Sequence, residues 1–206
     1  MNKRKTIGVL LILGLFFSIA LLITGCSSNG EQSSESKSAT ASGSDSKQED
    51  VSDNPIFALY NQIEINDTKE NVEKALGATG NTAAQGSYVY VDPDTGYAVN
   101  VFYNTKDLVT LKVLIPTTGA RELIELSNAS VTKEQVAKIS QGMTRSNVKK
   151  ALIGVGVEML RMVVPNSQDK EAYALAWINT DGSILIVTFD ADTDTVLSAE
   201  FKDNLL

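Results

Sequence analysis

The sequence predicts an α+β fold built from two tandem copies of one unit, a helix-turn-helix followed by an antiparallel β-sheet. Two ungapped internal matches indicate the duplication. Residues 68–76 align with residues 144–152 at a shift of 76, and both segments have the pattern of a short helix. The strand segments match at a shift of 87, which places Val91 on Ile178. The larger second shift gives copy two an insertion after its second helix.

Composition divides the chain into four parts. Residues 1–25 are predicted to be a lipoprotein signal peptide, and residues 26–53 a disordered, Ser-rich tether. The folded part begins near Asn54, with repeat 1 over residues 54–117 and repeat 2 over residues 118–206. About 150 residues are enough for one large core or two small ones.

Each copy is expected to begin with a first helix whose capping residues are visible. In copy one, Asp53 or Asn54 precedes Pro55, a favoured residue at the first helical position. The apolar residues that then share one face are Phe57, Tyr60 and Ile63. In copy two, Thr132 and Gln135 have the spacing of a capping box ahead of the apolar pair Val136 and Ile139.

The second helix of each copy is predicted to start after a threonine, Thr68 or Thr144, because its hydroxyl can accept from a free backbone N–H. These helices have only two or three turns, so they need a sheet to pack on. The residues expected to be buried there are Val72, Ala75, Leu76, Val148, Ala151 and Leu152.

Strands are predicted where β-branched and aromatic residues collect between turn-forming residues. Copy one is expected to have strands near residues 87–92, 96–104 and 108–115, and copy two near residues 172–179, 183–190 and 195–202. The insertion contains an apolar run, residues 157–164, that suits an additional strand. A weaker equivalent lies around residues 81–85. The segment from Glu158 to Lys170 is also a candidate rim for a binding surface.

The N-terminal residues are typical of a bacterial lipoprotein precursor. Basic residues at positions 3–5 precede an apolar run over residues 7–23, which is shorter than the about 20 residues of a membrane-spanning helix. The run ends in Leu-Ile-Thr-Gly-Cys, which resembles a lipobox. We therefore expect cleavage before Cys26 and attachment of diacylglycerol and a fatty acid such as palmitate. The alternative is an uncleaved anchor helix with an incidental cysteine.

Cysteine and charge usage restrict the partners. Cys26 is the only cysteine, which excludes disulfides and thiol catalysis by the folded part. The chain has 18 basic and 25 acidic residues, and three basic ones precede Cys26, which leaves the mature protein at −10. No nucleic-acid partner is expected of such a polyanion. Contact with the membrane is expected through the diacylglyceryl group on Cys26, whose two acyl chains bind more firmly than one.

The segment after the cysteine has hardly an aliphatic or aromatic residue. It cannot bury enough surface to offset the entropy of ordering, so it is predicted to be a flexible tether with a reach of about 30 Å. Ser27 stands where an Asp would signal retention in the inner membrane.

One motif carries a family resemblance. Residues 139–144 read Ile-Ser-Gln-Gly-Met-Thr, and a helix through Val148 and Leu152 leads to a glycine. This pattern resembles the signature of two related groups, the small envelope lipoproteins of the BamE (SmpA/OmlA) type and the tandem β-lactamase-inhibitor-protein-like (BLIP-like) fold. The resemblance covers nearly all of residues 55–206. It looks closest to the inhibitor-like lipoproteins of Gram-positive bacteria, which implies an extracytoplasmic protein in the outer leaflet of the cell membrane.

Copy one departs from this motif, with Ile-Asn-Asp-Thr at residues 65–68. The resemblance implies a BLIP-like fold for both copies. It does not imply β-lactamase inhibition, because a fold does not fix a function.

Catalytic motifs are sparse. The chain has no histidine, which excludes a Ser-His-Asp triad and His-ligated zinc. Ser146 and Lys149 have the Ser-x-x-Lys spacing of penicillin-recognising enzymes, but the companion Lys-Thr-Gly is missing from the mature chain, and its Ser-Asp-Asn, residues 52–54, lies before this pair rather than after it. Asp residues at 190, 192 and 194 suggest a calcium loop or, more simply, a solvated hairpin turn. No catalytic residue, metal or cofactor is predicted, although an acid–base pair of carboxylates remains open.

The aromatic residues are the candidate binding residues. Tyr88 and Tyr90 share one face of their strand, and Tyr97 and Tyr103 share one face of theirs. Trp177 matches Tyr90 at the strand shift of 87. If these side chains point away from the helices, the sheet presents an aromatic surface of the kind that anchors protein interfaces. If they point toward the helices, they belong to the core. The sequence leaves both alternatives open.

We expect a lipid-anchored binding module that recognises an envelope protein or an extracellular ligand through its sheet surface. The alternative is a permanent structural or assembly subunit of an envelope complex, the BamE-like role. A hydrolase is the third hypothesis.

Overall fold

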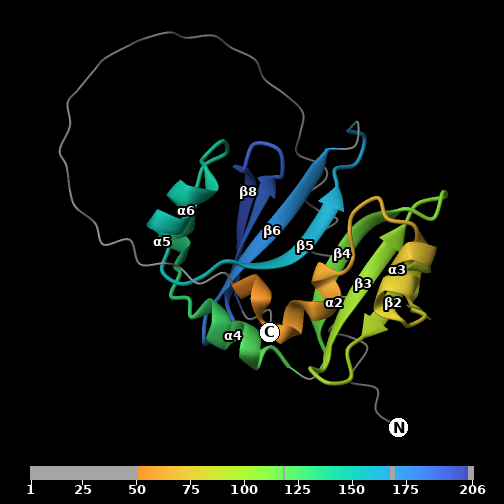
Figure 1. The fold of residues 1–206 in the computed structure, drawn as a ribbon. Helices are drawn as coiled ribbons and strands as arrows, with labels where there is room; N and C mark the ends of the chain where they lie inside the picture. The colour runs from red at the N-terminus through yellow and green to blue at the C-terminus, as the bar shows by residue number, and fades with distance from the viewer. Residues whose placement is uncertain (1–50, 118, 168–169, 204–206) are drawn as a thin grey trace. The chain divides into compact units, whose positions relative to one another are not determined.

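An antiparallel β-sheet of eight strands forms the centre of the fold, with the strands in sequence order (Figure 1). A computed structural model describes residues 51–117, 119–167 and 170–203, which form one compact unit. The predicted signal peptide, the lipidation site Cys26 and most of the tether lie outside these residues. The strands are β1 (Asn81–Thr82), β2 (Tyr88–Val91), β3 (Tyr97–Tyr103), β4 (Val109–Pro116), β5 (Val157–Val163), β6 (Glu171–Ile178), β7 (Ile184–Asp190) and β8 (Thr195–Lys202).

The α+β class and all six principal strands are thus confirmed, with small shifts at their ends. The apolar run of the insertion forms β5, and the weaker segment of the first half, residues 54–117, forms the two-residue β1. The interpretation of residues 158–170 as a rim is wrong for the part up to Val163, because β5 lies in the middle of the sheet between β4 and β6. Only three residue pairs join β4 to β5, fewer than join any other pair of neighbours from β2 to β8.

Short helices connect and cover the strands. They are the 3-10 turns η2 (Val51–Asp53), η3 (Pro55–Phe57) and η4 (Ala84–Gly86) and the helices α2 (Ala58–Asn61), α3 (Lys69–Leu76), α4 (Arg121–Ser127), α5 (Lys133–Val136) and α6 (Arg145–Ala151). None of the helices in the described ranges has the length and apolar character that a membrane span requires.

The predicted caps are confirmed. The side chain of Asn54 accepts from the backbone N–H of Ile56, and Thr132 and Gln135 form the reciprocal bonds of a capping box. Thr68 and Thr144 each accept from the N–H three residues on. The sequence therefore determines where these helices begin.

The predicted burial of the second helices is only partly right. Val72, Val148 and Leu152 are buried, but Ala75 and Ala151 are exposed and Leu76 is half-buried. Helix α3 ends at Leu76, where Gly77 adopts a left-handed conformation (φ 62°), so its last turn has little sheet beneath it.

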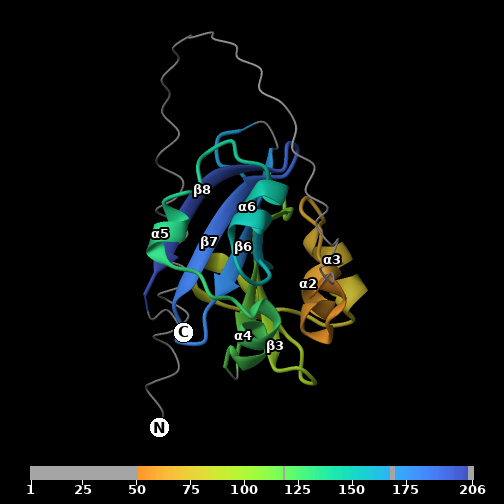
Figure 2. The same cartoon turned by 90° about the vertical axis from the view of Figure 1, so that its left-hand side faces the viewer.

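Register shows which side chains share a face of the sheet. Tyr88, Val101, Lys112, Arg161 and Tyr173 are paired in one row across β2 to β6. We call the side that carries this row the helix face. Helices α2 and α3 lie in front of it in Figure 1, and α5 and α6 lie in front of β6 and β7 in Figure 2. All these helices therefore pack on the same face of one sheet.

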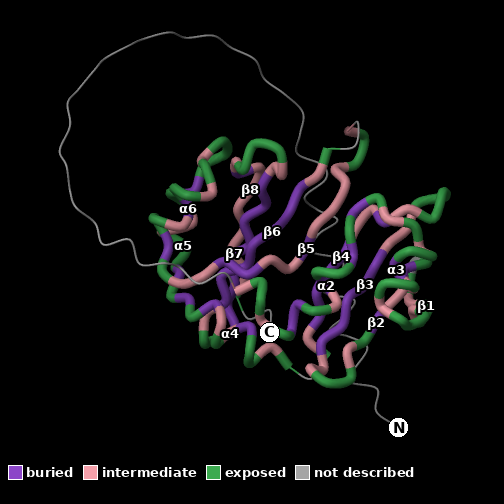
Figure 3. The backbone as a smooth tube through the Cα atoms, in the orientation of Figure 1, coloured by how far each residue is buried: buried purple, intermediate pink, exposed green. Residues whose placement is uncertain are grey.

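The buried residues concentrate along the central strands (Figure 3). In the second half, residues 118–206, the helices and the helix face enclose a core that contains Tyr173, Leu175, Trp177, Leu185, Val187 and Phe189. Gly156 lies flat against the ring of Trp177, since a Cβ there would come within 2.6 Å of the indole. Gly80 lies in the same way against Tyr90, at 2.7 Å.

The loops that precede α3 and α6 make the same backbone hydrogen bonds. Asn66 N–H donates to Val109 O, and Gly142 N–H donates to Val196 O, both at 2.9 Å. The backbone N–H of the first residue of each helix makes the next pair of bonds. Lys69 N–H donates to Asp107 O and Arg145 N–H donates to Asp194 O, again at 2.9 Å. Asn66 and Gly142 both have positive φ, 69° and 82°. Asn and Gly tolerate this conformation, which explains why these two residue types exchange here.

Candidate functional site

The five aromatic residues predicted to form a binding surface all lie on the helix face. Tyr90, Tyr97 and Trp177 are buried, with exposed fractions of 2%, 1% and 0%. The core alternative therefore describes these three. Tyr88 and Tyr103 are half-buried. The alternation of side chains had placed the residues in pairs correctly, but it contains no information on which face the helices cover.

Tyr88, Tyr90 and Tyr103 form a cluster beside α3. The hydroxyls of Tyr90 and Tyr103 are 2.9 Å apart, and the rings of Tyr88 and Tyr103 meet edge-to-face with centroids at 5.7 Å. The ammonium group of Lys69 lies 3.7 Å from the ring centroid of Tyr88. Burial raises the pKa of Tyr103 above its ordinary value of 10, and the bond to Tyr90 adds to this. The cluster is therefore part of the packing between α3 and the sheet.

The opposite face of the sheet is apolar as well. Its central row is Val89, Asn100, Val113, Leu160 and Ala174. Further along β6 and β7 it carries Ala172, Ala176, Ile178, Ile184, Ile186 and Thr188. These side chains are buried except Val89, which is half-buried, and the described α-helices lie on the helix face. An antiparallel sheet covered on one side ordinarily shows polar residues on the other, whereas this face is apolar and its central side chains are buried.

Two residues distinguish the opposite face, one polar and one apolar. Asn100 is 2% exposed, and its Oδ1 has no hydrogen-bond donor. Val91, which pairs with Ala98 on this face, is 49% exposed. The face therefore reaches solvent at the end of β2 and holds an unsatisfied acceptor near its middle.

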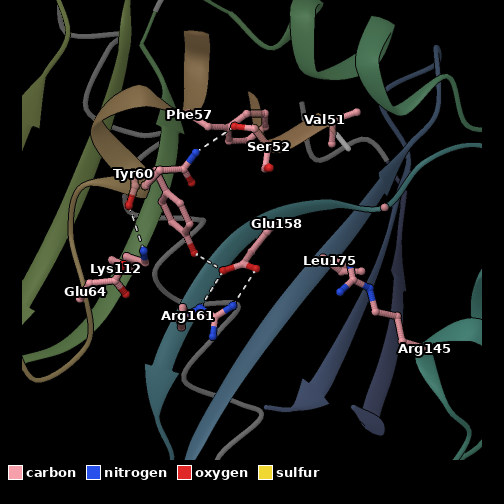
Figure 4. A pocket seen from close by; sticks show the side chains of 12 residues that line it. Val51, Ser52, Phe57, Tyr60, Glu64, Lys112, Arg145, Glu158, Arg161 and Leu175 are labelled. Atoms are coloured by element: carbon pink, nitrogen blue, oxygen red, sulfur yellow. Dashed lines mark hydrogen bonds and ion pairs between the residues drawn. The ribbon is translucent and has the colours of Figure 1, made fainter. Parts of the chain in front are cut away.

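A polar cavity of about 430 Å³ lies on the helix face, where the two halves of the chain meet (Figure 4). Its walls come from η2, α2, β4, β5, β6 and α6. The charged and phenolic side chains that line it are Tyr60, Glu64, Lys112, Arg145, Glu158 and Arg161.

Lys112 is the buried cation of this cavity, with 4% of its surface exposed. Its Nζ donates to Tyr60 O at 2.9 Å and to Ile63 O at 2.6 Å, and it lies 4.1 Å from the Tyr60 ring centroid. Burial lowers the pKa of Lys112 from 10.5 to about 8, although the carboxylates of Glu158 and Glu64 oppose this. The lysine thus fastens the C-terminal carbonyls of α2 to the sheet.

Glu158 and Arg161 form the ion pair at the floor of the cavity. Arg161 Nε and Nη2 donate to the two carboxylate oxygens of Glu158, each at 3.0 Å, and Tyr60 donates its hydroxyl to Glu158 Oε1 at 3.0 Å. Burial, with a further contribution from Glu158, raises the pKa of Tyr60 well above 10. Both Glu158 oxygens therefore have donors, and the network connects α2 to β5.

Arg145 enters the cavity from the start of α6. Its guanidinium carbon lies 5.7 Å from the ring centroid of Tyr173, and that of Arg161 lies 5.3 Å from the same centroid. Tyr173 donates its hydroxyl to Asp194. Burial, together with this bond, raises the pKa of Tyr173 above 10. Arg145 Nε is buried and has no hydrogen-bond acceptor.

The side chains that line the cavity can bind a ligand through hydrogen bonds and charge. Within the described ranges no group of three or more Asp, Glu, His or Cys side chains is placed to hold a metal ion. Ser146, of the Ser-x-x-Lys pattern, is exposed. Asp190, in the suspected calcium loop, accepts from the N–H groups of Asp192 and Thr193, as in a hairpin turn.

The sequence analysis did not identify this cavity. Its residues come from segments up to 124 positions apart, from Val51 to Leu175, and only tertiary packing brings them together. One signal was available, because Lys112 interrupts the otherwise apolar segment Leu-Lys-Val-Leu-Ile, and a lysine in such a strand needs a buried acceptor.

Comparison with known proteins supplies no identity for the chain. No protein-family model matches it. A search of the curated proteins finds no match either.

Proposed function

We propose that the protein is a lipid-anchored extracytoplasmic binding module that docks a protein of the cell envelope on the opposite face of its sheet. The lipobox at Cys26 and the tether supply the location. The observation that carries the binding role is the apolar character of a sheet face on which the described α-helices do not pack. A protein partner of complementary shape would contact this face at the margin where Val89 and Val91 remain accessible.

The details of the face favour a protein over a small molecule. It is built from strands of both halves of the chain. The unsatisfied Oδ1 of Asn100 suits a donor from a partner, since a buried acceptor without one is costly. Val91 offers an apolar contact at its margin.

The proposal includes a duplicated, BLIP-like organisation of the two halves. It is supported by the matching loop hydrogen bonds at Asn66 and Gly142, and by the glycine that lies against an aromatic ring in each half. These pairs occur at the two shifts that the sequence predicts. The binding role needs no catalytic group, which agrees with a chain that lacks histidine.

Photo-crosslinking in intact cells tests the docking face. Val91 and Ile153 are large apolar residues with exposed fractions of 49% and 60%, so each tolerates a photo-reactive phenylalanine derivative. Val91 is on the opposite face, whereas Ile153 follows α6. We expect one discrete protein adduct at position 91 and none at position 153. Equal labelling at both positions would contradict the proposal.

A second substitution keeps the test sharp. Val89→Glu places a charge on the same face and should abolish the adduct at position 91, while Val89→Thr should retain it. Far-UV circular dichroism of both variants checks that the fold is intact. A partner that co-purifies after mild detergent extraction without any crosslinking would favour the alternative, a permanent assembly subunit.

The anchor has its own test. Replacing Cys26 by Ala should abolish the incorporation of radiolabelled palmitate, because no other cysteine is present. Label on the Cys26→Ala product would overturn the lipoprotein assignment and leave the docking face unaffected.

A further inference from the structure

We propose that the cavity between α2 and α6 binds a small molecule through an anionic group, a carboxylate or a phosphate, with Arg145 as its main contact. This site lies on the helix face and is separate from the proposed docking face. Its volume, about 430 Å³, falls within the range of small-molecule pockets.

Arg145 is a cation of the cavity that has no carboxylate partner. Among the described residues it has no carboxylate within ion-pair distance, and its buried Nε has no acceptor. Asp194 accepts from the hydroxyl of Tyr173 and forms no ion pair with Arg145. A guanidinium group held over an aromatic ring is orientated for bidentate binding of an anion.

The other charges of the cavity favour an anion as well. Glu158 is neutralised by two bonds from Arg161 and one from Tyr60, so it does not repel a ligand strongly. Glu64 is exposed at the margin of the cavity, and the buried Lys112 adds a further positive charge to its lining. This cluster of positive charge contrasts with the net charge of −10 of the mature protein.

The equivalent position in the first half differs. Lys69 also begins a helix after a capping threonine and also lies over a tyrosine ring, but its ammonium group pairs with Glu73 at 3.7 Å. The anion site is therefore specific to the second half, and Lys69 is the matched control.

Tryptophan fluorescence provides the measurement. Trp177 is the only tryptophan of the chain, and it lies against Gly156, which lines the cavity. The mature lipoprotein in detergent is titrated with sodium phosphate and, separately, with citrate, against sodium chloride at constant ionic strength. We expect saturable binding of phosphate or citrate, and the better probe distinguishes the phosphate from the carboxylate class.

Three variants decide the assignment. Arg145→Gln should weaken binding about tenfold or more, Arg145→Lys should be intermediate, and Lys69→Gln should change the affinity less than about twofold. Thermal melting of each variant checks folding. If neither probe gives a response beyond that of chloride, or if the Arg145→Gln and Lys69→Gln variants lose affinity equally, the site is overturned.

Discussion

The two halves of the molecule share their loop geometry but differ in how they use it. The backbone before α3 and before α6 makes the same hydrogen bonds, and the following residue is cationic and lies over a tyrosine ring in both. In the first half that cation, Lys69, has an acidic partner on its own helix. In the second half Arg145 faces a cavity lined by residues of both halves. Similar scaffolds thus hold a cation paired with a carboxylate in one half and a cation without such a pair in the other.

The largest expected difference in stability concerns Trp177 and Tyr90, whose rings each lie against a glycine. Trp177 is fully buried, so Trp177→Ala should lower the free energy of unfolding by about 3–5 kcal/mol. Tyr90→Ala should lower it less, because the Tyr90 side chain borders the half-buried tyrosine cluster. Urea denaturation measures both, with Trp177→Phe as a milder variant if Trp177→Ala does not fold. A greater loss for Tyr90→Ala would contradict this ranking.

The second contrast concerns the ends of the paired helices. Leu152 is 7% exposed and packs in the core, so Leu152→Ala should cost about 2–5 kcal/mol of stability. Leu76 is half-buried, and its truncation should cost clearly less. Denaturation midpoints compare the two, and equal losses would show that the halves are packed alike at this position.

Lys112 has no counterpart in the second half, because Ala199 stands at the matching strand position. Its pKa is lowered to about 8, so between pH 8 and 10 the unfolded chain keeps a proton that the folded protein releases. The free energy of unfolding should therefore rise by about 1–2 kcal/mol from pH 8 to 9.5. Lys112→Met should remove this rise, as urea denaturation at each pH would show. The same slope in wild type and variant would contradict the assignment.

The smallest contrast concerns the exchange of Asn66 and Gly142. Gly142→Ala should cost about 1 kcal/mol, because φ there is 82° and a Cβ meets no neighbouring atom that would add a clash. Gly142→Asn should cost less, since Asn66 adopts this conformation in the first half. Chemical denaturation can resolve the difference, and an equal cost for Asn and Ala would remove the explanation.

Local sequence patterns predicted most of the fold. Caps such as Thr68 and Thr132 and the strand segments depend on neighbours in sequence, and these predictions are confirmed. Helix α4 was not predicted, because Ala120 at its start offers no capping side chain. The orientation of Trp177 and the meeting of Tyr60 with Glu158 depend on how whole elements pack, which no local pattern encodes.

The order of the strands has a consequence for how the chain acquires its structure. Each strand from β2 to β8 pairs with the strand that precedes it, so the strand pairings except that of β4 with β5 are made by hairpins of neighbouring segments. Folds of this kind form quickly, because little loop-closure entropy opposes each pairing. A chain synthesised from its N-terminus delivers each strand beside a partner that is already present. Until β8 pairs, the edge of β7 is open to capture by another chain.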